Sequence, residues 1–310
     1  MKLNLQIELF LADVCAGKTN ETEQAYRTKL RQLERYAKGR PITADLLKGF
    51  IHDLKTRKTH ISGHKAVDGG LSLYTIKTII QTARHFCKWS FENGHMREEL
   101  YKQIKVPSVP PPMPKALTED TFTLLLNSAQ NNISVEWESV RDVAILYFLR
   151  DTGGRVGGMV NALLPNVDLK SGEINTLEKG RNVKLYINEP TIEAIRLWLN
   201  YRSTLSPITD HLFTANRSGQ GITRGGVRWV LNRLSTKAGI TARHNAHAFR
   251  HAFARDFLKA GGEITQLAGI MHHSSIWVTT NYYARWNDKE LRSAHAAHSP
   301  INQTVEETPC

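Results

Sequence analysis

The chain has 310 residues, 41% of them hydrophobic and 23% charged, which excludes a wholly disordered protein and suits two domains better than one. The net charge of +12 is the electrostatic signature expected of a nucleic-acid binder, although another acidic partner stays open as an alternative. The three cysteines lie far apart with no CxxC pair, which argues against a structural zinc site and against a disulfide scaffold.

The beginning of the chain predicts helices. Apolar residues from Tyr26 to Leu33 share one helical face, and Gly39 with its neighbours Arg and Pro ends that helix. Thr43 is placed to cap a second, short helix. Residues 55–70 are polar, basic and contain glycine, which predicts a loop.

Ser72 begins the clearest helix of this half, whose apolar side recurs with helical spacing until Asn93 and Gly94 end it. A proline-rich segment follows and is centred on residues 106–117. Proline cannot continue a helix and favours stiff, extended chain, so this segment predicts an interdomain linker. A proline-rich loop inside one domain is the alternative.

The second half is mainly helical with one small sheet. Thr118 is placed to cap a helix, and a broadly apolar, buried helix is expected at about 137–150. Apolar residues alternate between 171 and 189 around the turn 179–182, which predicts a β-hairpin. Further helices are expected over four segments: 191–200, 224–238, 249–260 and the residues after 278.

Residue types suited to phosphate chemistry gather in this half. Two glycines make a sharp turn before Arg155, and Lys179 lies at the tip of the predicted hairpin. His247 and Arg250 stand three residues apart and share a helical face. Arginine offers a fork of donors that matches phosphate oxygens, and histidine exchanges a proton near neutral pH. A His-His-Ser-Ser segment containing His273 then precedes a pair of tyrosines.

The order and spacing of these residues resemble the tyrosine recombinase (phage integrase) family over about residues 118–290. The family pattern is a Thr-Gly-x-Arg box, a hairpin lysine, a His-x-x-Arg-His box, a Gly-His-Ser-Ser-like segment and a nucleophilic tyrosine. The resemblance implies the catalytic residues Arg155, Lys179, His247, Arg250, His273 and Tyr283.

The chain departs from the family pattern at three positions. Gly158 stands where an acidic residue usually follows the first arginine, Glu178 replaces the glycine before the hairpin lysine, and His272 replaces the glycine before His273. Support for the first arginine must therefore come from elsewhere, or activity is lower.

Two assignments keep an alternative. Tyr283 fits the Tyr-Ala-x-Trp ending of some members, and Tyr282 is the alternative nucleophile one residue earlier. His272 is the alternative to His273, and Lys184 is the fallback for Lys179.

The resemblance implies a fold that is mainly α with a small β-sheet. Residues 1–105 are expected to form a helical core-binding (SAM-like) domain and 106–117 the linker. Residues 118–298 are expected to form the α+β catalytic domain, and 299–310 a disordered tail.

The activity implied is site-specific DNA recombination through a 3′-phosphotyrosine intermediate and a Holliday junction, with no metal, other cofactor or ATP. Tyr283 attacks the phosphate, Arg155 and Arg250 clamp it, Lys179 is the general acid, His247 helps to take the proton of the tyrosine, and His273 hydrogen-bonds the phosphate. The implied partners are double-stranded DNA with recombination sites, a homotetramer on two sites and accessory DNA-bending proteins.

No convincing signal peptide and no apolar stretch of bilayer length occur, so we expect no membrane partner and a cytoplasmic, nucleoid-associated protein. Three other functions stay open. They are a type IB topoisomerase-like enzyme, a catalytically weakened sequence-specific DNA-binding protein, and a metal hydrolase that uses His244, His247 and His251 or the pair His272 and His273.

Overall fold

The computed structural model describes residues 2–62, 65–110, 115–131, 136–205, 208–215, 219–242, 244–273, 275–283, 288–299 and 301. The chain divides into two compact units, Met1–Pro112 and Met113–Cys310, and each is described by itself. The division falls inside the proline-rich segment 106–117. Of that segment, residues 111–114 lie outside the described part.

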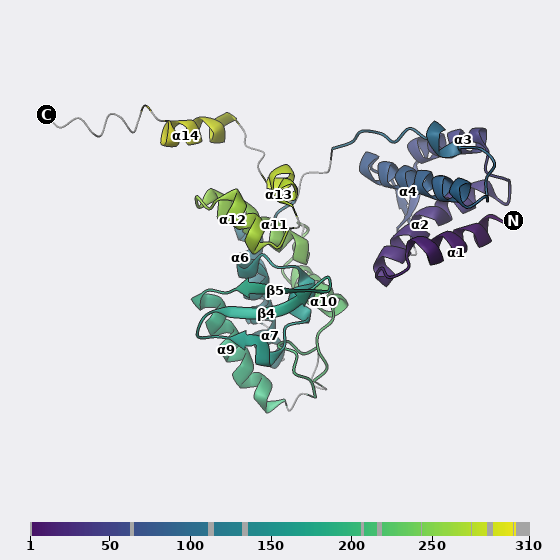
Figure 1. The fold of residues 1–310 in the computed structure, drawn as a ribbon. Coiled ribbons are helices and arrows are strands. Elements are labelled where there is room, and N and C mark those ends of the chain that lie inside the picture. The colour runs from purple at the N-terminus through teal and green to yellow at the C-terminus, as the bar shows by residue number, and fades with distance from the viewer. Residues whose placement is uncertain are drawn as a thin grey trace. The chain divides into compact units, whose positions relative to one another are not determined.

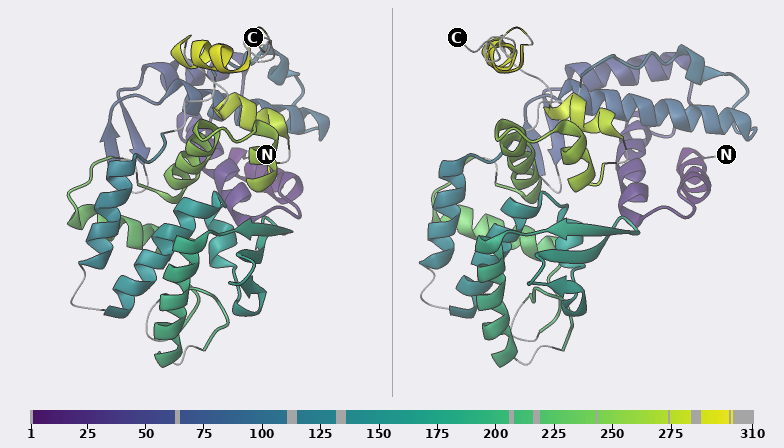
Figure 2. Two further views of the ribbon diagram at one scale, coloured as in Figure 1. Left: turned by 90° about the vertical axis from the view of Figure 1, so that its left-hand side faces the viewer. Right: turned by 60° about the vertical axis from the view of Figure 1, so that its left-hand side comes forward.

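The first unit is a helical bundle, as Figures 1 and 2 show. Its helices are α1 (Leu3–Val14), α2 (Asn20–Ala37), α3 (Ala44–Thr56), α4 (Leu73–Glu92) and the short α5 (Leu100–Gln103). Two of them begin as the sequence predicts, because the hydroxyls of Thr43 and Ser72 each accept a hydrogen bond from a backbone N–H of the first turn, and Thr19 caps α2 in the same way. Their apolar faces meet in one core around Phe10, which is completely buried.

The predicted loop at residues 55–70 is wrong. The structure has an antiparallel hairpin there, with β1 (Thr59–Ser62) paired to β2 (Lys65–Asp68) in the register Thr59 to Asp68. Each strand has only four residues, so its sequence contains at most two or three alternations between polar and apolar residues. The many basic residues make this short pattern indistinguishable from that of a polar loop.

The second unit carries the remaining elements. The helices are α6 (Glu119–Gln130), α7 (Glu136–Thr152), α8 (Val156–Val160), the 3-10 turn η1 (Leu164–Asn166), α9 (Glu189–Thr204), α10 (Arg224–Lys237), α11 (Ala246–Lys259), α12 (Ile264–Ile270), α13 (Ile276–Tyr283) and α14 (Asp288–His298). The strands are β3 (Val167–Asp168), β4 (Glu173–Glu178) and β5 (Arg181–Tyr186), and they form one antiparallel sheet in that order. The expectation of a mainly α fold with a small sheet is confirmed.

Helix α7 is the central element of this unit. It packs against α6, α9 and α11 and also contacts β5, an arrangement that can be followed in Figures 1 and 2. Its burial on nearly all sides explains its broadly apolar sequence. The helix also carries one buried ion pair: Arg141 and Asp142 are both almost completely buried, and the Arg141 guanidinium donates hydrogen bonds to the Asp142 carboxylate. Helix α7 therefore holds the turn at Gly153, which follows it, against the core.

The hairpin β4–β5 closes with a tighter turn than the sequence suggests. Glu178 pairs with Arg181, so the turn is the two residues Lys179 and Gly180, and the predicted turn 179–182 is too long by the two residues that begin β5. Both turn residues have positive φ, 49° and 76°, as a two-residue turn matched to strand twist requires. Lys179 therefore stands at the tip, as predicted.

Helices α13 and α14 lie in the region after residue 278 where helix is expected, while residue 300 and residues 302–310 of the expected disordered tail lie outside the described part. Within the described residues, no helix is both long and apolar enough to span a membrane.

Candidate functional site

The turn between α7 and α8 presents Arg155. Gly153 has φ of 58°, and a Cβ there would lie 2.3 Å from the ring of Phe253, so both backbone and space require glycine. The hydroxyl of Thr152 accepts a hydrogen bond from the backbone N–H of Gly154 at 3.2 Å and fixes the turn. The Arg155 side chain is left about one-quarter exposed.

Glu178 is the carboxylate that holds Arg155. Its two oxygens accept hydrogen bonds from the backbone N–H and from Nη1 of Arg155, each at 2.7 Å. The Glu178 side chain is almost completely buried. The support for Arg155, which the glycine at 158 cannot supply, therefore comes from the end of strand β4.

Arg250 connects α11 to two other segments. Its guanidinium is buried and donates to the backbone oxygens of Gly153 at 2.7 Å and Met271 at 2.8 Å. Burial, together with the charge of Arg155, lowers the pKa of Arg250 to about 10. The two arginines therefore lie within electrostatic reach, and Arg250 is still charged at neutral pH.

His273 is the histidine that contacts Arg250. Its Nε2 accepts from Nη2 of Arg250 at 2.7 Å, so the opposite nitrogen, Nδ1, is left to donate to the hydroxyl of the fully buried Thr279 at 2.6 Å. Burial lowers the pKa of His273 to about 4, and the neighbouring arginines act in the same direction. His273 is thus neutral at physiological pH.

His272 points to a different part of the unit. Its Nε2 lies 2.8 Å from the backbone oxygen of Lys184 on β5. Its φ is 50°, the left-handed region that glycine adopts most readily, which explains why a glycine suits this position in the family pattern. The geometry thus favours His273 over His272 as the functional histidine.

The hydroxyl of Tyr283 lies 2.5 Å from Nδ1 of His251. Burial raises the pKa of Tyr283 to about 12, against the opposing effect of Arg250, so the phenol is protonated at neutral pH. His247 lies one turn earlier on α11, is exposed, and its ring stacks on that of His251 with 6.3 Å between centroids. Tyr282 is also partly buried, with its ring 6.4 Å from that of Tyr283.

The two lysine candidates differ in environment. Lys179 is exposed at the hairpin tip, directly after the residue that holds Arg155. Lys184 lies further along β5 and pairs with Glu173 at 2.8 Å, which raises its pKa. An amine held in such a pair is a poor proton donor, so the geometry favours Lys179.

The structure thus brings Arg155, Arg250, His273 and Tyr283 together. Lys179, directly after Glu178, and His247, stacked on His251, are both exposed. Sequence reasoning gave no part in the recombinase site to three residues that contact its candidate catalytic side chains: Glu178, His251 and Thr279. Glu178 and His251 do stand inside or beside the motifs, so their positions were a usable signal, whereas nothing in the sequence marks Thr279.

The alternative of a histidine metal site depends on whether the candidate histidines lie together with other metal-binding side chains. His244 contacts Ser235, Asn232 and the backbone oxygen of Ala242, all within the surroundings of α10. Among the residues that the structure describes, no group of three or more His, Cys, Asp or Glu could hold a metal ion.

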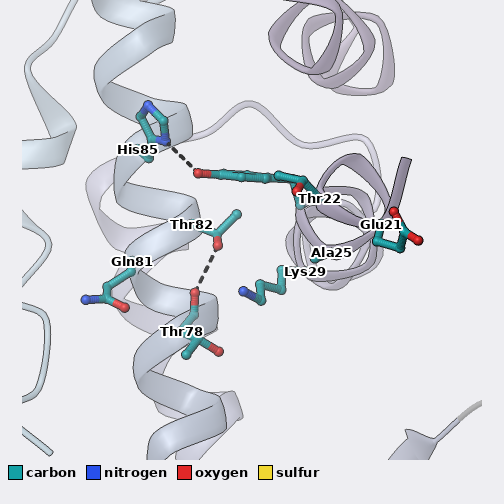
Figure 3. A pocket seen from close by; sticks show the side chains of 9 residues that line it. Glu21, Thr22, Ala25, Lys29, Thr78, Gln81, Thr82 and His85 are labelled. Atoms are coloured by element: carbon teal, nitrogen blue, oxygen red, sulfur yellow. Dashed lines mark hydrogen bonds between the residues drawn. The ribbon is translucent and has the colours of Figure 1, made fainter. Parts of the chain in front are cut away.

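A second candidate surface lies on the first unit, between α2 and α4. This hollow has a volume of about 570 Å³. Figure 3 shows Lys29 between the two helices and Thr82 and His85 on α4. Burial lowers the pKa of Lys29. The phenol of Tyr26 contacts Nδ1 of His85 at 3.4 Å across it. The hollow holds none of the six candidate catalytic residues. Its lining carries one lysine, Lys29, together with the acidic Glu21, so Lys29 is its candidate contact for a phosphate group.

The sequence of the second unit matches a known protein family. A sequence model of the phage integrase family matches residues 115–290. Tyrosine recombinase XerC of Leptospira interrogans serogroup Icterohaemorrhagiae serovar copenhageni is 31% identical over 209 residues, which cover 66% of this chain and 67% of that protein. Tyrosine recombinase XerD of Halalkalibacterium halodurans is 26% identical over 308 residues, which cover 96% and 97% of the two chains.

Solved structures extend the likeness to both units. The Tn1549 transposon integrase, solved in complex with transposon right end DNA, aligns with a TM-score of 0.72 at 18% identity. The alignment covers 96% of this chain and 99% of that one. At this level of identity the likeness concerns the fold.

Proposed function

This chain belongs to the phage integrase family of site-specific tyrosine recombinases, and we propose that it cuts and rejoins duplex DNA through a covalent 3′-phosphotyrosine link formed by Tyr283. The observation that carries the proposal is the convergence of four separate segments. The turn at Arg155, helix α11 with Arg250, the segment at His273 and helix α13 with Tyr283 meet around one buried guanidinium.

The reaction needs a group that holds the phosphate. Arg250 and Arg155 bind the non-bridging oxygens of the scissile phosphate and offset the negative charge of the crowded transition state. His273 adds a hydrogen bond to the same phosphate once its ring releases Arg250: in the other neutral tautomer Nε2 carries the proton and donates it to the phosphate, while Nδ1 accepts from the Thr279 hydroxyl. A site with two preorganised arginines supplies this stabilisation from the chain itself, so the proposed reaction requires no metal. The phosphotyrosine ester keeps the energy of the broken phosphodiester bond, so rejoining requires no ATP.

The proposed cleavage step forms a bond from the tyrosine oxygen to phosphorus, breaks the bond to the 5′ oxygen and transfers one proton at each of these two oxygens. The oxygen of Tyr283 attacks phosphorus, the bond from phosphorus to the 5′ oxygen breaks, and Lys179 protonates that oxygen so that a 5′ hydroxyl leaves. His251 accepts the hydrogen bond of the Tyr283 hydroxyl and is the proposed first acceptor of its proton. His247, stacked on His251 and open to solvent, keeps its proposed part in removing the proton.

The first unit is the proposed core-binding domain. Its hollow between α2 and α4 contacts phosphate groups through Lys29, while the catalytic unit 118–298 contacts the scissile site. Recombination of two sites through a Holliday junction requires four protomers, and accessory DNA-bending proteins assist where the sites demand it. The proposed location is the cytoplasm, in association with the nucleoid.

The decisive experiment traps the covalent intermediate. The purified chain is incubated, without metal or ATP, with nicked duplex fragments drawn from DNA that flanks its own gene. Cleavage next to the nick releases a short fragment that cannot religate, so the adduct accumulates. The adduct is measured on a denaturing gel, and mass spectrometry of the DNA-linked peptide identifies the residue.

We expect the adduct on Tyr283, its absence in Tyr283→Phe and its persistence in Tyr282→Phe. His251→Ala should slow adduct formation roughly 100-fold near neutral pH, the contribution typical of a general base. An adduct on Tyr282 would keep the reaction and move the nucleophile. Tight DNA binding with no adduct would replace the proposal by the catalytically weakened DNA-binding protein, and relaxation of supercoiled DNA without exchange would favour the topoisomerase-like enzyme.

A further inference from the structure

The acidic partner of Arg155 stands on a strand and not on the helix that follows the arginine. Glu178 is the last residue of β4, 23 positions after Arg155 in the chain. It accepts from both the backbone N–H and the guanidinium of Arg155 at 2.7 Å, so one carboxylate fixes the start of the side chain and its end.

Gly158 provides the space for that carboxylate. A Cβ built at Gly158 would lie 2.8 Å from Oε1 of Glu178, 3.1 Å from its Cγ and 3.3 Å from Cγ2 of Thr176. The backbone oxygen of Gly158 also accepts from the Thr176 hydroxyl at 2.8 Å, which holds α8 against β4. The Glu178 side chain therefore fills the volume that any side chain at 158 needs, and the two positions exclude one another.

The same contact positions the hairpin tip. Glu178 pairs with Arg181 across the turn, and Lys179 and Gly180 alone separate them. The hydrogen bond that the buried Glu178 carboxylate accepts from the Arg155 backbone N–H ties the base of this turn to the Arg155 backbone. Lys179 then projects from a tip whose base is fixed relative to Arg155.

We propose that Glu178 is the positioning residue for Arg155, and that positions 158 and 178 form one exchangeable site for a single carboxylate, filled in this chain from β4. This inference rests on the proposed role of Arg155 at the scissile phosphate. The glycine at 158 and the glutamate at 178 are then one coordinated change, and a chain with both changes retains an oriented arginine.

The distances indicate that an aspartate at position 158 can place a carboxylate where that of Glu178 lies. An aspartate oxygen lies two bonds from Cβ, about 2.4 Å away. This is close to the 2.8 Å that separates a Cβ at 158 from Oε1 of Glu178.

The test therefore compares four full-length proteins: the wild type, Glu178→Ala, Gly158→Asp and the double variant Gly158→Asp/Glu178→Ala. Glu193→Gln, which removes an exposed glutamate paired with Arg196 on α9, is the control.

The rate of adduct formation at saturating DNA and the midpoint of thermal unfolding are measured for each protein, and the DNA affinity is measured as a separate, third quantity. Glu178→Ala should lower the saturating rate roughly 100-fold, the effect expected when a reacting group is misplaced by about 1 Å, with little change in affinity. Gly158→Asp should lower both the rate and the midpoint, because two carboxylates compete for one space. The double variant should recover both quantities relative to either single variant, and the control should match the wild type.

Several outcomes overturn the inference. Glu178→Ala with a wild-type rate would show that Arg155 needs no such partner. A double variant that recovers the midpoint and not the rate would make Glu178 a stabilising residue only. Additive loss in both quantities would show two independent sites. If the wild type itself forms no adduct, the proposed function fails, and the unfolding midpoints still decide whether 158 and 178 share one carboxylate site.

Discussion

At the scale of single residues, burial moves the pKa of Arg250, His273 and Tyr283 in the direction of the neutral form. The pKa of the arginine falls to about 10, that of the histidine falls to about 4 and that of the tyrosine rises to about 12. A phosphate that enters this environment places negative charge beside the buried Arg250, so its binding favours the charged form of that arginine. The site is therefore electrostatically suited to an anion.

His273 gives a prediction about pH. Its folded pKa of about 4 lies below the ordinary value of 6.5, so the unfolded chain binds a proton in this range that the folded chain refuses. The contribution of His273 to stability is therefore complete above the ordinary value and is lost as pH falls toward 4. Thermal unfolding at about pH 7.5 and about pH 5 should show a larger loss for the wild type than for His273→Gln. An equal loss in the two proteins would contradict the lowered pKa.

At the scale of elements, the site depends on two turns that both use a left-handed glycine. Gly153 follows α7 and Gly180 closes the β4–β5 hairpin, with φ of 58° and 76°. Their surroundings differ, because a Cβ at Gly153 meets the Phe253 ring whereas nothing lies within 4 Å of a Cβ at Gly180. Substitution at Gly180 therefore measures the free-energy cost of backbone strain alone, whereas substitution at Gly153 adds the cost of a steric clash with the Phe253 ring.

Alanine substitution measures this difference. Gly180→Ala should lower the free energy of unfolding by the backbone cost alone, roughly 1–2 kcal/mol. Gly153→Ala adds overpacking against Phe253, for a total of roughly 2–5 kcal/mol, and it also displaces the backbone oxygen that Arg250 uses. Urea unfolding of both variants checks the order. Equal losses would show that the Phe253 ring moves aside freely.

The two kinds of element also differ in how well the sequence predicts them. Helices that begin at Thr43, Ser72 and Thr118 were predictable, since a capping hydroxyl and a repeating apolar face are local signals. The hairpin at Thr59–Asp68 was not, because four-residue strands contain too few alternations to outweigh a basic, glycine-containing composition.

At the scale of the whole molecule, the net charge of +12 predicts that DNA binding weakens steeply as salt rises. Lys29, in the hollow of the first unit, is a proposed phosphate contact. Lys29→Gln should therefore reduce the slope of log affinity against log salt by about one and weaken binding equally for all DNA sequences. Lys48→Gln, at an exposed lysine paired with Asp45 on α3, is the matched control. An unchanged slope in Lys29→Gln would remove this hollow from the DNA-binding surface.

The sequence by itself determined the family, the mainly α character and the order of the motif residues along the chain. These properties reside in local patterns: helical periodicity, capping residues, and boxes such as His247 to Arg250, whose members are close in sequence. Such patterns survive without knowledge of what packs against them.

Only the tertiary structure decided which side chains meet. Glu178 reaches Arg155 across 23 residues, His273 and not His272 contacts Arg250, and Tyr283 contacts His251 across 32 residues. These contacts depend on how β4, α8, α11 and α13 pack together. A carboxylate can be supplied from any element that passes the site, so sequence spacing could report the missing acid at Gly158 and could not report where its replacement stands.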